Sequence, residues 1–353
     1  MTDTRKPSAI ALISGGLDSM LAAKVILDQG VHVEGVNFYT GFCVEGHTHA
    51  VRAKNKNKQK RNNALWVAEQ LGIKLHIVDV IEEYKDVVLN PSHGYGKNLN
   101  PCLDCKIFMV HKALDLSGFD TDSFDFVITG EVIGQRPKSQ KNETMPIIAQ
   151  ESGAHDRLLR PLCAKNLPET LPERAGWINR ELLHGFYGRN RKPQMELAAR
   201  YGFTDYAQPA GGCCFLTDER YSSKLKDLWQ FRGEKNYELD DILLLKIGRH
   251  IRPNARFKLI MAREEGENRF LRGYRKNFTY IEIDSHEGPL TLVEGNPSTS
   301  DLTLATRLVG RYSQGKNADE VSVTIHHRNG VSEQIRASPI APHEIPDNWH
   351  IGL

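Results

Sequence analysis

One glycine-rich turn in this chain has the residue types and spacing of a phosphate-binding segment. It reads SGGLDS at residues 14–19, directly after the apolar run Ala9 to Ile13 and directly before a helical pattern that starts at Met20. Glycines let backbone N–H groups approach an anion closely, and a helix start adds partial positive charge. Two hydroxyls add further donors. The residues predicted to hold phosphate are Ser14, Gly15, Gly16 and Ser19.

Asp18, inside this turn, cannot bind phosphate by charge. We expect it either to coordinate a Mg²⁺ ion that the phosphates share or to hold the loop in shape. No Lys-Ser or Lys-Thr follows the glycines, so the turn is not a Walker loop, and it is not Gly-x-Gly-x-x-Gly.

Three cysteines form the second chemical signal. Cys102 and Cys105 make a C-x-x-C where a helix is expected to begin, and a thiolate is favoured at a helix N-terminus. Cys213 follows a glycine pair in AGGCCFLTD, residues 210–218. Three thiolates with one open position suit an iron–sulfur cluster. A structural zinc site, which needs four ligands, is the alternative.

The other three cysteines carry weaker signals. Cys43 and Cys163 are isolated in the sequence, and we expect them to be small buried residues. Cys214 lies beside Cys213, so the sequence leaves open which of the two is the ligand.

A third group of candidate residues follows the apolar run Phe126 to Thr129. The glycine Gly130 brings this loop close to a ligand at the sheet edge, and Gln135 and Arg136 can donate hydrogen bonds to phosphate oxygens. Arg160 is a further candidate for phosphate contact. The alternative for either arginine is a salt bridge without functional meaning.

The elements that must position these residues alternate in type. Strands are predicted at 10–13, 33–38, 75–78 and 126–129, and helices at 18–29, 50–71 and 103–116. This alternation predicts an α/β fold with a doubly wound parallel sheet, whose ligands bind beyond the carboxyl ends of the strands. A nucleotide base is expected against the backbone of Asn37 and Phe38, where the second strand ends.

The pattern changes near residue 235, so we predict two domains, 1–235 and 236–353. Residues 161–212 are predicted to form helices and turns that extend the first domain. The second domain is predicted to be a smaller β-rich or α+β unit. Its expected strands are 242–247, 257–262, 270–274, 278–283, 290–293, 302–308 and 321–326.

Composition places the chain among ordinary globular proteins. Its 353 residues are 40% hydrophobic and 25% charged, and no apolar run has the length of about 20 residues that a membrane helix needs. The polar residues 1–6 do not resemble a signal peptide, so we expect a cytoplasmic protein without a membrane partner. The net charge is only +2, but residues 52–61 hold six cations and no anion, which is either a phosphate-binding face or a solvated helix face. The segment 246–263 also carries several Lys and Arg residues and no acid.

These motifs together resemble the PP-loop ATP pyrophosphatases that thiolate tRNA, in particular short forms of the 4-thiouridine synthetase group. The resemblance covers about residues 8–230 and is carried by SGGLDS, NPCLDC, TGEVIGQRPKSQ, RPLCAKNLPET and AGGCCFLTD. Residues after 245, including Lys246-Ile-Gly-Arg-His250, resemble more weakly the RNA-binding domain of the NFACT family.

The resemblance implies an ATP-dependent sulfur transfer to a tRNA uridine. A carbonyl oxygen would be adenylated, AMP would leave, and sulfur would replace it, with ATP and Mg²⁺ at the SGGLDS turn. It further implies a [4Fe–4S] cluster on Cys102, Cys105 and Cys213, with Asp18, Cys102 and Cys213 as catalytic residues. In relatives without a cluster, two cysteines and a persulfide do this work, which here would be Cys102 with Cys213. The donor would be sulfide or a persulfide carrier.

Two other functions fit parts of the sequence. One is a ligase or amidotransferase partner that adenylates a small molecule and carries structural zinc. The other is an RNA-binding protein without catalysis. The cationic run and the β-rich second domain favour a polymer substrate, and RNA is the natural one. The sequence determines neither the uridine, nor the oxygen exchanged, nor the oligomeric state.

Overall fold

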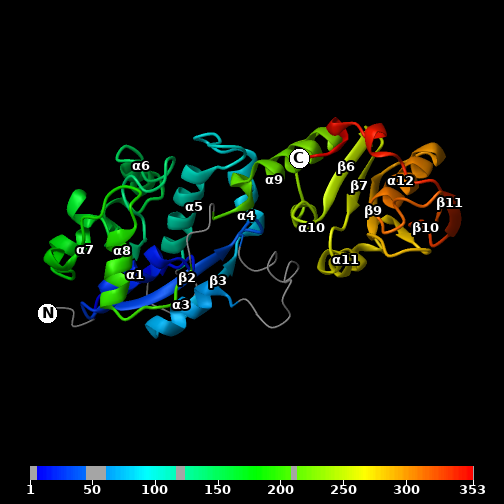
Figure 1. Ribbon diagram of the computed structural model, residues 1–353. Coiled ribbons are helices and arrows are strands. Elements are labelled where there is room, and N and C mark those ends of the chain that lie inside the picture. Colours follow the sequence, from blue (N-terminus) through cyan, green and yellow to red (C-terminus); the bar gives the residue numbers. More distant parts are fainter. Residues whose placement is uncertain (1–5, 45–60, 117–123, 208–212, 353) are drawn as a thin grey trace. The chain divides into compact units, whose positions relative to one another are not determined.

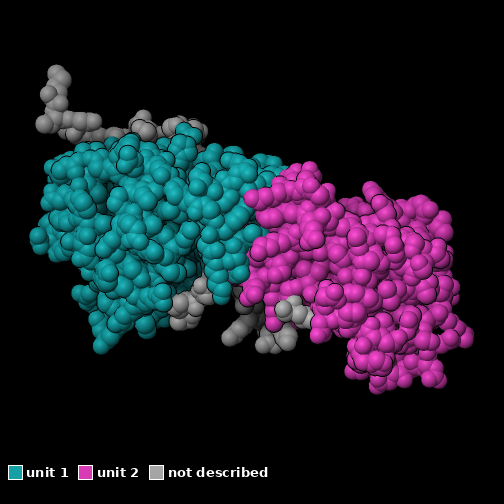
Figure 2. Space-filling model, turned by 90° about the horizontal axis from the view of Figure 1, so that it is seen from above, with its two compact units in different colours: residues 1–43, 61–213 teal, residues 44–60, 214–353 magenta. Residues whose placement is uncertain are grey.

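The computed structural model describes residues 6–44, 61–116, 124–207 and 213–352. The chain forms two compact units, residues 1–43 with 61–213, and residues 44–60 with 214–353 (Figure 2).

A five-stranded parallel sheet forms the centre of the first unit (Figure 1). The strand order is β3-β2-β1-β4-β5, so β1 lies between β2 and β4 and the order reverses there. In such sheets the ligand site lies at the carboxyl ends of the strands that flank the reversal. The strands are β1 (Ser8–Leu12), β2 (His32–Tyr39), β3 (Leu75–Asp79), β4 (Phe126–Ile128) and β5 (Leu158–Leu159).

Helices pack in two groups around this sheet. Helix α1 contacts α3 and α8, whereas α5 contacts α4, α6 and the strands β1 and β4. Apolar residues of β1, α1 and α3 form one continuous buried core. This is the doubly wound α/β arrangement that the sequence predicted. The helices are α1 (Leu17–Leu27), α3 (Asn63–Leu71), α4 (Ile81–Leu89), α5 (Cys102–Leu114), α6 (Thr144–Glu151), α7 (Leu171–Arg174) and α8 (Lys192–Arg200).

The predicted helix 50–71 is shorter than expected. Helix α3 begins at Asn63, because the side chain of Asn62 accepts hydrogen bonds from the backbone N–H groups of Ala64 and Leu65 and so caps the helix. Residues 45–60, which hold most of the cationic run 52–61, lie outside the described residues. Arg61, the last residue of that run, pairs with Asp205 and stacks on Trp66.

The second unit contains a six-stranded antiparallel sheet in the order β11-β10-β8-β9-β7-β6. Helix α12 contacts β7, β8, β10 and β11, and its apolar residues join the strands in a buried core. The strands are β6 (Arg249–Asn254), β7 (Phe257–Met261), β8 (Thr279–Ile283), β9 (Thr291–Gly295), β10 (Val321–His326) and β11 (Ser332–Ala337). The helices are α9 (Glu219–Arg232), α10 (Leu239–Leu244), α11 (Glu265–Leu271) and α12 (Thr299–Arg311).

Three predicted strands of this unit are wrong, because their segments are helical. Residues 302–308 lie in α12. Residues 242–244 form the end of α10, and residues 245–247 follow that helix. Capping boxes start both helices, at Ser298 and at Glu238. Residues 270–274 end α11 and continue as a 3₁₀ turn. Strands β6 and β11 were not predicted. A short apolar run does not distinguish a strand from a buried helix, and at α10 and α12 the capping boxes favour the helix.

The boundary between the units also differs from the predicted one near 235. It follows Cys213, since helix α9 belongs to the second unit. Tyr221 of α9 donates to the carbonyl of Ile242, and Asp227 accepts two hydrogen bonds from Arg252 of β6. None of the helices over the described residues has the length and apolar character needed to cross a bilayer.

A buried lysine joins α9 to the second sheet and provides a test of this packing. Lys258 of β7 is 1% exposed, and its Nζ lies 2.6 Å from Glu294 Oε2 of β9 and 3.7 Å from Asp227 Oδ2 of α9. We expect Lys258→Met to lower the free energy of unfolding by about 3–5 kcal/mol, because Glu294 loses its partner. Urea denaturation measures this loss.

The matched variant replaces both partners of that pair. Lys258→Met with Glu294→Leu should recover most of the lost stability, since no unpaired charge remains buried. A double variant as unstable as the single one would show that packing volume, and not the unpaired charge, causes the loss.

Candidate active site

The SGGLDS turn connects β1 to α1 at the carboxyl end of the central strand. Gly15 has φ +79°, a left-handed conformation that favours glycine, and Gly16 is the N-cap residue of α1. The Ser19 hydroxyl donates to the carbonyl of Gly16 at 2.8 Å and lies 3.4 Å from the Ser14 hydroxyl. The predicted strand, turn and helix start are therefore present in the predicted order.

Two glycines let backbone segments approach this turn closely. A Cβ on Gly15 would lie 2.7–2.9 Å from the start of α3, at Asn63 and Ala64. A Cβ on Gly130 would lie 2.5–2.6 Å from the backbone of Asp18 and Ser19. The loop after β4 thus packs directly on the first turn of α1, as the adjacent positions of β1 and β4 require.

Asp18 is held by two side chains from outside its own loop. Its Oδ2 accepts from Gln135 Nε2 at 2.7 Å, and its Oδ1 accepts from Arg191 Nη2 at 3.3 Å. Gln135 in turn accepts at 3.2 Å from Gln194 of α8, which is fully buried. These contacts favour the loop-shaping role for Asp18. Mg²⁺ binding by this carboxylate stays a prediction.

The end of β2 is fixed to the end of β1. The Asn37 side chain donates to the carbonyl of Ile13 at 2.7 Å, while Phe38 is buried. This contact aligns the two strand ends beside the SGGLDS turn. The expected contact of a nucleotide base with Asn37 and Phe38 stays a prediction.

The thiols lie at the start of α5 and beside it. Helix α5 begins at Cys102, whose Sγ donates to the Ser139 hydroxyl at 3.3 Å. Cys102 and Cys105 are half-buried and Cys213 is exposed. Cys213 affects the pKa of both other thiols, so the three sulfur atoms share one neighbourhood.

Burial changes the chemistry expected of the C-x-x-C pair. It raises the pKa of Cys102, and together with Cys213 and Cys102 it raises the pKa of Cys105 to about 12. Desolvation therefore acts against the predicted thiolate stabilisation by the helix start, which stays a prediction for these two residues. Lys106 and Arg136 act in the opposite direction on Cys102, but more weakly.

The described residues contain no group of three His, Cys, Asp or Glu side chains arranged to hold a metal ion. As placed, the three thiols are close but do not form a ligand set, so their geometry supports no reaction step through a cluster. Asp104, between the two cysteines, instead accepts hydrogen bonds from the backbone and ring of His93. The [4Fe–4S] cluster stays a prediction.

The guanidinium of Arg160 is bound to other groups of the buried core. It is 5% exposed, and it donates to Glu131 Oε2 and to the carbonyl of Met145, both at 3.1 Å. A buried carboxylate needs such a partner, so the structural ion pair is the better interpretation of Arg160. Cys163 is buried beside it and donates to the Glu131 carbonyl, as expected for a core cysteine.

Glu131 was not selected from the sequence, yet it links the core to the thiols. Burial acts to lower the pKa of Lys106, but the pKa is raised overall. The Glu131 carboxylate is the largest of the causes that raise it. Arg191 and Gln194 were also missed, since only folding brings α8 beside Asp18. A sequence signal existed in the basic stretch Arg189 to Lys192, which leads into α8 and includes its first residue.

The contact of Gly130 with α1 predicts that no side chain is tolerated there. We expect Gly130→Ala to lower the free energy of unfolding by about 1–3 kcal/mol, because the new methyl group meets backbone that cannot move aside. ATP binding, measured by calorimetry, should weaken with it. Gly273→Ala is the control: a Cβ there meets nothing within 4 Å, so stability should be unchanged or slightly higher.

The raised thiol pKa values predict an order of alkylation. After chelator treatment, iodoacetamide at pH 7 should modify exposed Cys213 before Cys105, and the rate at Cys105 should still increase above pH 9. The reason is that a thiol with a raised pKa carries little thiolate at neutral pH. Peptide mass spectrometry measures each site. Rapid modification of Cys105 at pH 7 would contradict the pKa direction.

Comparison with known proteins agrees with this architecture. Residues 8–156 match the family described as the tRNA methyl transferase HUP domain, and residues 248–350 match the NFACT protein RNA binding domain. A tRNA-specific 2-thiouridylase MnmA of Pseudomonas entomophila is 25% identical over 255 residues, covering 71% of this chain and 62% of that protein. One from Corynebacterium urealyticum is 35% identical over 127 residues, covering 34% of this chain and 30% of that protein. The matches thus span less than two thirds of these relatives.

A solved 4-thiouridine synthetase–RNA complex with bound ATP aligns with 21% identity and a TM-score of 0.33, covering 68% of this chain and 52% of that one. An alignment this loose carries no argument about the site. The family matches do define the parts of the chain. The chain thus holds one segment similar to the tRNA methyl transferase HUP domain and a second similar to the NFACT RNA binding domain, and it is similar at 25% identity to MnmA thiouridylases.

Proposed function

We propose that this protein thiolates a uridine of tRNA in an ATP-dependent reaction. The observation that carries the proposal is that one loop, residues 130–139, contacts both the SGGLDS turn, which we call the phosphate turn, and a thiol. Gln135 of this loop donates to Asp18, and Ser139 accepts from Cys102. A phosphate site and a sulfur site joined by one short loop suit a reaction that activates an oxygen and then replaces it with sulfur.

In the first step the SGGLDS turn holds the triphosphate of ATP. Backbone N–H groups at the start of α1 and the hydroxyls of Ser14 and Ser19 are the donors, as at other helix N-termini that bind phosphate. Arg191, fixed by Asp18, adds a cation. The uridine carbonyl oxygen attacks the α-phosphorus, pyrophosphate leaves, and the oxygen becomes part of a good leaving group, AMP.

In the second step the thiols deliver sulfur. Cys105 is the least suited to act as a thiolate, so Cys102 and exposed Cys213 are the proposed pair. A persulfide on one cysteine attacks the activated carbon and AMP leaves. The second cysteine then attacks the sulfur of the first, which releases the thiocarbonyl and leaves a disulfide that an external thiol reduces.

The cluster-based route differs from this one in a measurable way. Protein purified without oxygen, analysed for iron and acid-labile sulfide, separates the two. A content of about four irons and four sulfides per chain would favour a cluster on Cys102, Cys105 and Cys213 over the persulfide mechanism. Zinc alone would indicate a structural site.

The test of the function is thionucleoside formation in bulk tRNA, supplied with ATP and either sulfide or a persulfide carrier. Digestion and mass spectrometry should detect a thiouridine that requires ATP. Asp18→Ala should lower the rate about 100-fold or more, since Gln135 and Arg191 lose their anchor. Cys102→Ser and Cys213→Ser should abolish it.

The control variant is Cys43→Ser, because the hydrogen-bond partners of the Cys43 thiol are Thr40 and the backbone of Phe38. Its turnover should equal that of the unchanged protein. Exchange of pyrophosphate into ATP that needs a small acid or amine, and no tRNA, would instead indicate an adenylating ligase. Thiolation that survives Asp18→Ala would contradict the assignment of the phosphate turn.

A further inference from the structure

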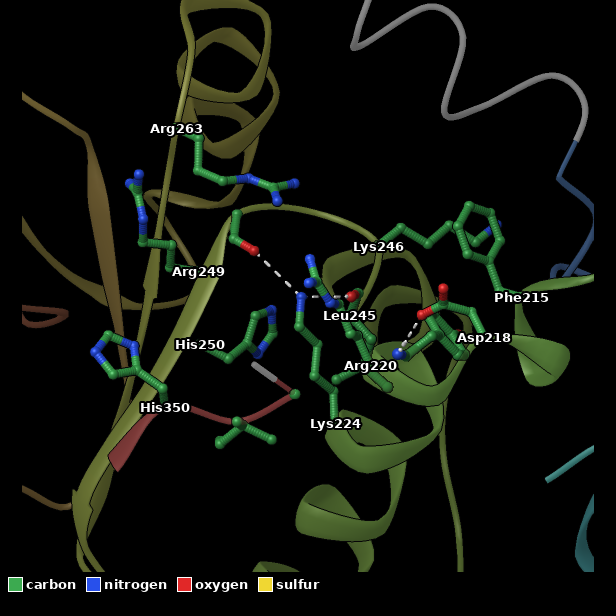
Figure 3. A pocket seen from close by; sticks show the side chains of 14 residues that line it. Phe215, Asp218, Arg220, Lys224, Leu245, Lys246, Arg249, His250, Arg263 and His350 are labelled. Carbon is green, nitrogen blue, oxygen red and sulfur yellow. Dashed lines mark hydrogen bonds between the residues drawn. The ribbon is translucent and has the colours of Figure 1, made fainter. Parts of the chain in front are cut away.

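The second unit contains a cavity of about 250 Å³ that the thiolation chemistry does not use (Figure 3). Its wall comes from α9, from the turn between α10 and β6, and from the chain near His350. Much of this wall precedes residue 248, where the match to the RNA-binding domain begins. Helix α9 of this chain therefore completes a site that the matched segment alone does not form.

Cations dominate this wall. Arg220, Lys224, Lys246 and Arg249 line it, and Asp218 is the one carboxylate among the lining residues. That carboxylate is already used as a helix cap, since it accepts from the backbone N–H of Tyr221 at 2.8 Å. The cavity thus has a net positive charge and suits an anion.

The cationic side chains are held in place by their neighbours. Lys224 Nζ donates to the carbonyls of Leu245 and Gly248, both at 3.2 Å (Figure 3). Lys246 Nζ lies 5.0 Å from the Phe215 ring centre, and the Arg249 guanidinium lies 4.9 Å from that of Tyr312. Cations fixed on carbonyls and ring faces lose little further freedom when an anion binds.

Two further basic residues of the cavity, Arg263 and His250, are less able to bind an anion. Arg263 pairs with buried Glu267 at 2.7 Å. Burial, with help from Lys224, lowers the pKa of His250, whose ring donates to backbone carbonyls instead. Arg220 and Arg249 differ: over the described ranges neither has a carboxylate oxygen within 4.0 Å of its guanidinium nitrogens. These two arginines are the groups available to a bound anion.

We propose that this cavity binds a backbone phosphate of the RNA substrate, so that α9 and the NFACT domain hold the strand together. The inference deepens the proposed function, because it takes RNA as the substrate. The cavity volume is below the roughly 300–1,000 Å³ of sites that enclose drug-sized ligands. A cavity of this size fits a phosphate with its attached sugar, but not a whole nucleotide-sized ligand. Arg220 is exposed, so its guanidinium is accessible to an RNA strand outside the cavity.

The test measures binding of a tRNA transcript to the full-length protein at several KCl concentrations. Arg220→Gln and Arg249→Gln should each weaken binding, and the double variant should reduce the slope of log K against log salt by about 1, since one phosphate contact is lost. Arg336→Gln is the matched control, since it removes the same charge from an exposed arginine on β11. It should leave the slope unchanged.

Unchanged affinity and slope in the double variant, with an unchanged melting temperature, would overturn the inference. Equal losses in Arg336→Gln would overturn it too, because they would indicate a diffuse charge effect. Inorganic phosphate and pyrophosphate serve as competitors at constant ionic strength. If the double variant loses pyrophosphate binding but keeps its tRNA affinity, the cavity takes a free anion and the RNA assignment is wrong.

The same variants separate this inference from the proposed function. Asp18→Ala should lower the thiolation rate as stated above and keep tRNA binding, whereas the double arginine variant should raise the tRNA concentration needed for half-maximal rate. Absence of thiolation in the unchanged protein, with the slope changes observed, would refute the proposed function and leave the RNA site standing.

Discussion

The candidate active site depends on one backbone contact, that of Gly130 with the first turn of α1. A Cβ at this position would lie 2.5 Å from the backbone of Asp18 and Ser19, so only glycine permits the approach. This contact exists because β1 and β4 are parallel neighbours, so their carboxyl ends meet at the same sheet edge. It brings Gln135 to Asp18 and Ser139 to Cys102, and thereby connects the SGGLDS turn to the thiol of Cys102 through one loop.

Buried charge is the second constraint on this site. Glu131 follows Gly130 and is 1% exposed, which requires compensation by cations. Arg160 supplies a direct ion pair, and Lys106 responds to the same carboxylate. Lys106 also follows Cys105 in the sequence, so a cation that acts on Glu131 lies beside one of the thiols. Glu131 therefore pairs with a core arginine and also acts electrostatically on a lysine next to the C-x-x-C pair.

In the second unit, helix α9 both packs on the sheet and lines the cationic cavity. Neither its position before the matched domain nor its composition indicates this. Asp227 of α9 pairs with Arg252 and lies near buried Lys258, which ties the helix to the sheet. The N-terminal half of α9 places Arg220 and Lys224 at the cationic cavity. The packing of the second unit and the proposed anion site thus use the same helix, and the boundary between the units falls before it.

The sequence by itself determined the parallel α/β class, the SGGLDS turn and the three cysteines, because local glycine geometry and strand–helix alternation depend on neighbouring residues. It did not determine that α12 and α10 are helices, since caps outweighed the apolar runs there. Tertiary structure alone decided that Arg191 holds Asp18, that Arg160 pairs with Glu131, and that burial raises the pKa of Cys105. Each of these depends on which distant segments meet, and on how much water they exclude.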